Sequence, residues 1–214
     1  MEAAQEIGDD DMVTSVLSLK SHLAWSVGDA GSAVGLAQAG QREPGRVSDT
    51  VLALIAQQEA RGHALDGDAA ATERALDRSA ALTYAAAEHL EDAPPWVYFN
   101  DPDRLGFQRG VAYVELGRHG EAVPLLTAAL GALDSGYDRD RARYAAVLAL
   151  ALAAAGEADA AVEHAKRGAE LAAQTGSALA TRELRRVRVA LREAGADAAL
   201  AELMEHLHAL AATR

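Results

Sequence analysis

The chain has 214 residues, 50% of them apolar and only 4% aromatic, and a formal net charge of −12. It contains no cysteine, which excludes disulfides, thiolate zinc sites and iron–sulfur clusters. No apolar run approaches the roughly 18 residues that span a bilayer and no signal-peptide pattern is present, so we expect a cytoplasmic protein with no membrane partner. Most of the acidic excess lies in the first half, which disfavours direct binding of nucleic acid. Abundant alanine favours closely packed helices, and we predict an all-α protein.

Glycine-centred turns divide the sequence at regular intervals. They fall at Gly28, Gly67, Gly117, Gly156 and Gly195. The separations are 39, 50, 39 and 39 residues, and each turn lies between two Ala/Leu-rich stretches of helical periodicity. A fixed period of this size indicates stacked helical hairpins, because no single hairpin buries its apolar face alone. We therefore predict a right-handed α-solenoid of about five antiparallel hairpins over residues 13–212, after an acidic tail of residues 1–12.

Small residues recur at fixed distances from each turn glycine. In the first four hairpins, the residues seven before, five after and twelve after the glycine are all small, which lets the paired helices approach closely. These positions are Ser21, Ala33 and Gly40, then Ala60, Thr72 and Ser79, then Gly110, Ala122 and Ala129, and finally Ala149, Ala161 and Gly168. The fifth hairpin has Arg188, Leu200 and Leu207 instead, as a terminal capping unit would.

The first helix of each early hairpin carries polar or aromatic residues at helical spacing. In the first hairpin His22 and Trp25 lie on adjacent turns. The tryptophan either stacks a ligand or covers the end of the core, and we favour the cover. In the second hairpin Gln57 and Arg61 lie on one stripe, which we expect to face the concave side of the solenoid.

The longer step between the second and third turns contains an insertion rich in aromatic residues. Residues 90–103 read LEDAPPWVYFNDPD and include Trp96, Tyr98 and Phe99. The two prolines hold the chain extended and end the preceding helix. The aromatic side chains either fill a gap between hairpins or cover a groove. We favour the first alternative because buried aromatics are usually part of a core.

The third hairpin begins with a clear helix-start pattern. Asp101 is a suitable N-cap and Pro102 suits the first helical position. We expect arginines of successive hairpins to meet in the groove and bind a carboxylate or phosphate through paired N–H groups. The side-chain amides of the glutamines would form hydrogen bonds with a peptide backbone. The alternative is that they pair with nearby carboxylates such as Asp101 or Glu59. The predicted ligand-binding residues are Gln57, Arg61, Trp96, Tyr98, Arg104, Phe107, Gln108 and Arg143.

The last hairpin carries five arginines within the stretch RELRRVRVALR, residues 182–192. We favour a solvated helix face paired with Glu183 and Glu193 over a surface for nucleic acid or an acidic partner. The same hairpin offers an apolar stripe for a possible homodimer. The stripe consists of Leu200, Leu203, Leu207 and Leu210.

The sequence contains no catalytic motif. It has no GxxxxGK phosphate loop, no GxSxG nucleophile turn and no HExxH pair. His206 and His208 point to different sides of a helix, which makes them poor joint ligands of a metal. We therefore expect a protein that is not an enzyme and that holds neither metal nor cofactor.

The small, aromatic, glycine and alanine positions of the third hairpin resemble the tetratricopeptide repeat (TPR). They are Gly110, Tyr113, Gly117, Ala122 and Ala129. Three longer segments resemble the C-terminal repeat region of actinobacterial helix-turn-helix (XRE-type) transcriptional regulators. These segments are residues 51–68, 94–118 and 136–157.

The resemblance implies a TPR-like sensor domain of a transcriptional regulator, which binds a small molecule or peptide in its concave groove and dimerises. The binding would be relayed to the regulator's own DNA-binding domain or to a protein partner. No basic helix-turn-helix precedes the repeats in this sequence, so DNA binding is not carried over. The alternative is a stand-alone adaptor that binds a protein partner without any small ligand.

Overall fold

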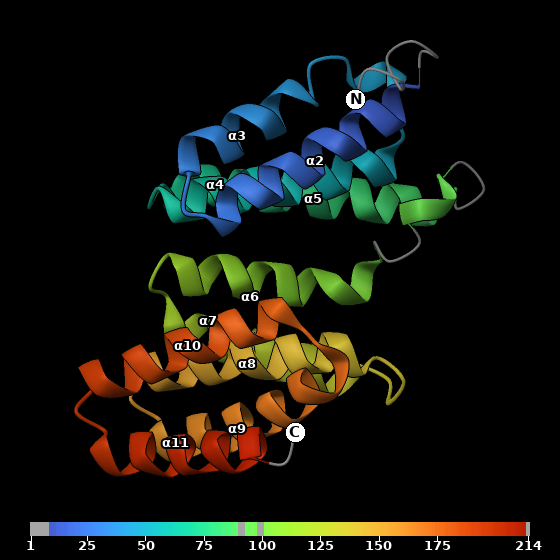
Figure 1. Cartoon of the computed structure of the whole chain (residues 1–214). Helices are drawn as coiled ribbons and strands as arrows, with labels where there is room; N and C mark the ends of the chain where they lie inside the picture. Colours follow the sequence, from blue (N-terminus) through green and yellow to red (C-terminus); the bar gives the residue numbers. More distant parts are fainter. Residues whose placement is uncertain (1–8, 90–92, 98–100, 213–214) are drawn as a thin grey trace. The chain divides into compact units, whose positions relative to one another are not determined.

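The computed structural model describes residues 9–89, 93–97 and 101–212. The regular secondary structure of this part of the chain is all helical, as predicted, with no strand (Figure 1). The α-helices are α2 (Asp10–Ser26), α3 (Ala30–Ala39), α4 (Asp49–Leu65), α5 (Ala69–Ala87), α6 (Leu105–Glu115), α7 (His119–Ala132), α8 (Asp138–Ala154), α9 (Ala158–Thr175), α10 (Ala178–Glu193) and α11 (Asp197–Ala212). Short 3-10 turns are η1 (Pro44–Arg46), η3 (Pro95–Val97) and η4 (Pro102–Arg104). None of the described helices has the length and apolar character needed to cross a membrane.

All five predicted turn glycines are confirmed by their backbone conformation. Their φ angles are positive: Gly28 85°, Gly67 80°, Gly117 73°, Gly156 87° and Gly195 67°. Only glycine adopts this region at no steric cost, so each turn ends one helix and admits the next within a few residues. One more glycine of this kind, Gly176 with φ 64°, ends α9 between the fourth and fifth hairpins.

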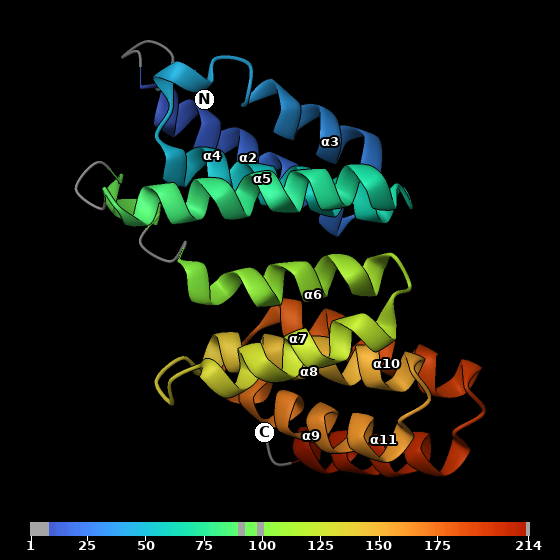
Figure 2. The ribbon, with the colours of Figure 1, turned by 180° about the vertical axis from the view of Figure 1, so that it is seen from behind.

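The chain divides into two units, Met1–Gln108 and Arg109–Arg214. In the first unit α4 is the central helix and packs against α2, α3 and α5, as the front and back views show (Figures 1 and 2). In the second unit α8 packs against α7, α9 and α10, while α11 packs mainly against α9. Among the described helices the first, α2, begins at Asp10, earlier than the expected start at residue 13. The predicted solenoid arrangement stays a prediction.

The small positions beside the turns are buried in all of the first four hairpins, as the spacing predicts. Three of them, Gly40, Gly110 and Gly168, are glycines at which an added Cβ would be tight. A Cβ on Gly110 would lie 2.7 Å from Cγ of Leu126, and one on Gly168 would lie 3.2 Å from the backbone nitrogen of Ala146. Such distances force a neighbour to move, so the missing side chains let α6 meet α7 and α8 meet α9 closely.

The fifth hairpin departs from this packing, again as predicted. Arg188, Leu200 and Leu207, which stand at its seam positions, are all only partly buried. The apolar stripe expected to dimerise is interrupted, because Leu203 is fully buried inside the second unit. It therefore lies in the core of the unit and is not part of a surface available to a second copy.

Aspartate caps begin several helices. The side chains of Asp9, Asp29 and Asp68 each accept a hydrogen bond of 2.9 Å from the backbone N–H three residues later. Asp101, the predicted cap, accepts from the backbone N–H of Arg104 at 3.1 Å. The residues it caps form the 3-10 turn η4, which continues into α6. Each cap satisfies a backbone donor that the helix itself leaves unpaired.

Candidate ligand-binding site

The middle of α4 is polar although the helix is enclosed by its neighbours. Gln57 is 4% exposed, Gln58 5%, Glu59 7% and Arg61 4%. Burying amides and charges in this way is costly unless each finds a partner. The partners of these side chains divide into two groups, one around Glu59 and one around Arg61.

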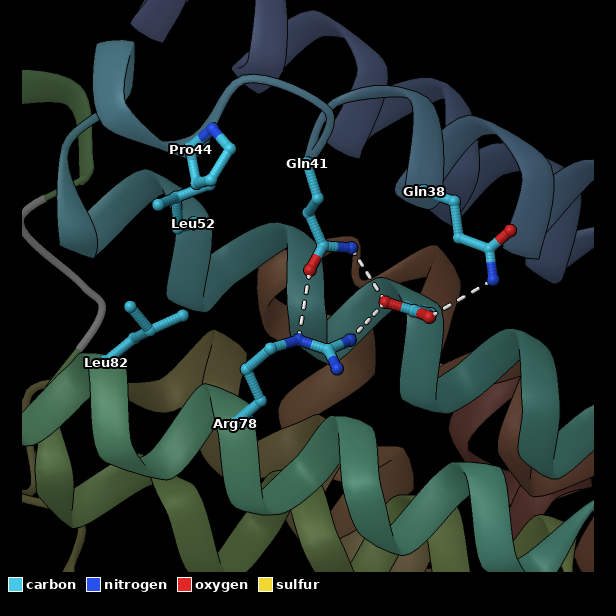
Figure 3. A pocket seen from close by; sticks show the side chains of 7 residues that line it. Gln38, Gln41, Pro44, Leu52, Arg78 and Leu82 are labelled. Atoms are coloured by element: carbon cyan, nitrogen blue, oxygen red, sulfur yellow. Dashed lines mark hydrogen bonds and ion pairs between the residues drawn. The ribbon is translucent and has the colours of Figure 1, made fainter.

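Three donors and the imidazole of His63 surround the carboxylate of Glu59. Gln41 donates to Oε2 at 2.7 Å, and the guanidinium of Arg78 on α5 donates to the same oxygen. Gln38 donates to Oε1 at 3.3 Å, and His63 lies 3.5 Å from that oxygen. Figure 3 shows Gln41 above, Arg78 below and Gln38 to the right of this centre. The carboxylate thus joins the end of the first hairpin to both helices of the second.

The environment of Glu59 keeps it ionised. Burial acts to raise the pKa of its carboxyl group, but the hydrogen bond from Gln41, the charge of Arg78 and the contacts with Gln38 and His63 outweigh it. The pKa is therefore lowered from its ordinary value of 4.5. A charged acceptor with strong donors on both oxygens gives the cluster a fixed geometry at neutral pH.

A pocket of about 410 Å³ opens beside this cluster. Its apolar wall consists of Pro44, Leu52 and Leu82, which lie together to the left of the polar group in Figure 3. Arg78 also donates from Nε to Oε1 of Gln41 at 3.2 Å, and its side chain stays 43% exposed. Its Nη1 forms no hydrogen bond with any described residue. The site therefore combines an apolar wall with a positioned donor.

The second group surrounds Arg61. Its Nη1 donates to Nδ1 of His22 at 3.0 Å and to Oε1 of Gln58 at 3.1 Å. Nδ1 of His22 also lies 3.3 Å from the same oxygen of Gln58. The guanidinium also lies 5.4 Å from the ring centroid of Trp25, which is 2% exposed. The tryptophan covers this cluster and is not available to stack a ligand.

The structure brings some of the predicted ligand-binding residues together. Arg61 donates to Oε1 of Gln108, the last residue of the first unit. Gln57 and Phe107 are buried. Arg104 pairs with Asp101, with Nε and Oδ2 3.3 Å apart, which is the structural alternative considered for the arginines. Ligand contact by these residues stays a prediction.

The aromatic insertion is described only in part. Tyr98 and Phe99 lie outside the described residues. Trp96 is 37% exposed and donates from Nε1 to Oγ of Ser15 at 3.1 Å, which ties the insertion to α2. Val97 is the buried member of η3. A pocket of about 330 Å³ lies beside this segment, lined by Thr50, Thr83, Ala86, Ala87, Ala93, Pro94, Pro95, Val97, Asp101 and Pro102.

Arg143, the remaining predicted ligand contact, belongs to α8 of the second unit. Burial lowers the pKa of its guanidinium, and the nearby carboxylate of Glu183 partly opposes that effect. Glu183 also accepts from Arg186 at 3.0 Å and lies 3.6 Å from Arg182. The expected pairing of the arginine-rich stretch with Glu183 is thus confirmed, while Glu115 on α6 is a further partner of Arg186, at 2.7 Å.

The sequence reasoning missed Glu59, Gln38, Gln41 and Arg78 as a possible binding site. The available signal was the polar run QQEAR in the middle of a helix that is otherwise Ala/Leu-rich. Within the described ranges no group of three or more side chains is arranged to hold a metal ion. No protein-family model matches the chain, and no curated protein matches it either.

Proposed function

We propose that the chain is a ligand-sensing, TPR-like module of a transcriptional regulator, whose five hairpins form a right-handed solenoid. Positive-φ glycines at the regular turns and the buried small residues beside them support the repeat. The resemblance to actinobacterial regulators supports the sensing role. The ligand site is the pocket of the first unit bordered by Glu59 and Arg78.

One observation carries this proposal. When the second and fourth hairpins are aligned on their turn glycines, the four polar residues of α4 fall opposite buried apolar residues of α8. The pairs are Gln57 and Ala146, Gln58 and Val147, Glu59 and Leu148, and Arg61 and Leu150. A central helix of this chain therefore packs well with apolar side chains alone. Since buried charges rarely add stability, the polar run of α4 points to binding.

The pocket itself suggests the chemistry of the ligand. Its volume of about 410 Å³ suits a small molecule or the end of a peptide. Glu59 already accepts from three protein donors, so it offers little to an incoming group. The guanidinium of Arg78 still has an unused edge, which favours a carboxylate or carbonyl oxygen. The ligand would place that oxygen on Arg78 and an apolar body against Leu52 and Leu82.

The position of the pocket explains how binding could be sensed. Gln38 and Gln41 belong to the end of the first hairpin, whereas Glu59 and Arg78 belong to the second. A ligand that contacts both hairpins stabilises one arrangement of the pair over others, and its differential affinity sets the size of the shift. We propose that this shift is relayed to a DNA-binding domain or a protein partner.

The test uses N-acetyl-leucine as a carboxylate probe and N-acetyl-leucinamide as its neutral counterpart, titrated by isothermal calorimetry. We expect the carboxylate to bind at least about tenfold more tightly, because a charge-assisted pair with Arg78 is stronger than a neutral hydrogen bond. Arg78→Gln should remove this preference. Arg74→Gln, an exposed arginine on the same helix outside the pocket, is the matched control.

Leu82→Trp provides a second variant that does not change charge. Leu82 is only partly buried, so the larger side chain can be accommodated while it fills the pocket. It should weaken both probes equally. Absence of saturable binding for both probes, or binding that neither Arg78→Gln nor Leu82→Trp affects, would contradict the proposed site.

A further inference from the structure

The fifth hairpin forms a groove of about 570 Å³ within the second unit. Helices α10 and α11 contact each other much less than α8 and α9 do. The cause lies at the seam, where Arg188 and Leu207 stand in place of the small residues of the other hairpins. Both of these bulky residues line the groove. The departure from the repeat pattern thus opens a space between the two helices, with α9 as its floor.

The groove has an apolar interior. Ala169 and Ala172 of α9 and Gly176 at its end form the floor. Leu184 of α10 and Leu210 of α11 line the sides. An apolar space of this volume lies in the usual range for sites that enclose a small molecule.

Two cations also line the groove, and none of the described residues that line it is an anion. Arg185 and Arg188 are one turn apart on α10, and neither forms an ion pair with a described residue. The Nε of Arg188 is shielded from solvent and has no hydrogen-bond partner. A buried donor of this kind is costly unless an acceptor reaches it. Their neighbour Arg186, by contrast, is paired with Glu115 and Glu183.

We propose that this groove binds an anionic amphiphile, an aliphatic carboxylate of the fatty-acid class. The aliphatic tail of the ligand lies along the alanine floor. Its carboxylate accepts hydrogen bonds from the guanidinium of Arg188, and Arg185 adds a positive charge at the rim. This site is distinct from the pocket of the first unit and does not depend on the function proposed for that pocket.

The place of Arg188 among the lining residues favours a small amphiphile over an acidic amphipathic helix. A docked helix places its apolar stripe in a groove and keeps its carboxylates near the rim, where they reach the exposed Arg185. An aliphatic carboxylate that lies in the groove brings its charge inside, where the guanidinium of Arg188 lines the wall. The charge and the apolar lining are complementary to the same molecule.

The experiment compares decanoate, below its micelle concentration, with decan-1-ol in titrations followed by NMR chemical shifts. Wild type should bind decanoate at least about tenfold more tightly than the alcohol. Arg188→Gln should reduce that preference to about twofold or less, and Arg188→Lys should retain part of it because the charge stays. Arg192→Gln, an exposed arginine of α10 outside the groove, should leave it unchanged.

Two further variants keep the test decisive. If Arg188→Gln disturbs the helical content, the exposed Arg185→Gln should still lower the preference severalfold. Leu207→Trp should fill the groove and weaken both probes together. Equal affinity for decanoate and decan-1-ol in the wild type overturns the proposal. So does preferential binding of an acidic amphipathic peptide, or a dimer that Leu210→Glu dissociates.

Discussion

The central helices of the two units, α4 and α8, are enclosed in the same way but bury different kinds of side chain. Both α4 and α8 are surrounded by three other helices of their unit. The middle of α8, from Tyr144 to Ala153, is continuously buried and almost entirely aliphatic. The middle of α4 instead carries two amides, a carboxylate and a guanidinium. The comparison shows that the polar residues of α4 are not needed to make a central helix.

The two units also differ in where their charges lie. In the second unit the partly buried Glu115 of α6 and the buried Glu183 of α10 lie on flanking helices and share Arg186. In the first unit the buried carboxylate belongs to the central helix itself. Its donors must therefore be supplied by α3, the turn after it and α5, which is why its cluster joins two hairpins. A carboxylate on a central helix thus needs donors from more elements of its unit than a carboxylate on a flanking helix.

The two units also differ in the side-chain caps at the starts of the second helices of their hairpins. In the first unit Asp29 and Asp68 cap α3 and α5 through their side chains. The corresponding residues of the second unit, Arg118 and Glu157, form no side-chain cap to α7 and α9. A cap of this kind contributes about 1 kcal/mol. The caps thus offset part of the cost of a polar core in the unit that has one.

The largest effect is expected when the carboxylate of α4 is transferred to the equivalent place in α8. In Leu148→Glu the new carboxylate enters a fully buried position. The free energy of unfolding of the second unit should fall by about 3–5 kcal/mol. Urea unfolding followed by circular dichroism measures the change. Ala154→Glu, at the exposed end of the same helix, should change it little, and an equal loss in both variants would show that the buried position does not matter.

A smaller effect is expected when the carboxylate of α4 loses its charge. Glu59→Gln keeps the shape but weakens the charge-assisted hydrogen bonds from Gln41 and Arg78, at a cost of about 1–3 kcal/mol near neutral pH. Because the folded-state pKa of Glu59 lies below 4.5, its contribution is complete above that pH. It is lost as the pH falls through the lowered pKa. Urea midpoints of the two proteins should therefore converge as the pH is lowered from about 7 to about 3.

The control for this pH series is Glu43→Gln, which removes an exposed carboxylate from the same unit. It lies next to Arg46 in a surface ion pair of 3.4 Å, which contributes little. Its midpoints should follow those of the wild type throughout the series. A gap between wild type and Glu59→Gln that stays constant down to the lowest pH would mean that ionisation of Glu59 does not stabilise the unit.

The smallest loss of stability, none at all, is expected when α4 is given the residues of α8. The quadruple variant is Gln57→Ala, Gln58→Val, Glu59→Leu and Arg61→Leu. Replacing a buried charged cluster by apolar side chains is often neutral or stabilising by about 1–4 kcal/mol. Thermal unfolding should show a folded protein whose stability is unchanged or raised. A large loss of stability would mean that the cluster serves the fold.

Much of the architecture was accessible from the sequence. The turn glycines, the small seam residues and the Asp101 cap are local features, each fixed by the conformation or the space of a single position. The periodicity of α4 predicts which residues share a face of the helix. It does not predict how many other helices pack around it and therefore which faces are buried. Gln57 and Arg61 were therefore expected to face an open groove, whereas the structure encloses both.

The candidate site depended on contacts between distant segments. Glu59 meets Gln41 and Arg78, 18 and 19 residues away, and Trp96 meets Ser15 across 81 residues. No periodicity within one helix indicates such partners. The one signal at hand was internal: aligning the hairpins on Gly67 and Gly156 places a polar run opposite an apolar one.

The two tryptophans of the chain, Trp25 and Trp96, both belong to the first unit. One is enclosed beneath a guanidinium and the other is partly open to water, so their emission spectra differ in the folded protein and merge when the unit unfolds. The second unit has tyrosines but no tryptophan. With excitation at long ultraviolet wavelengths, tryptophan fluorescence therefore reports the unfolding of the first unit alone. Ellipticity reports the loss of helix in both units, so the two signals together separate the unfolding of one unit from that of the other.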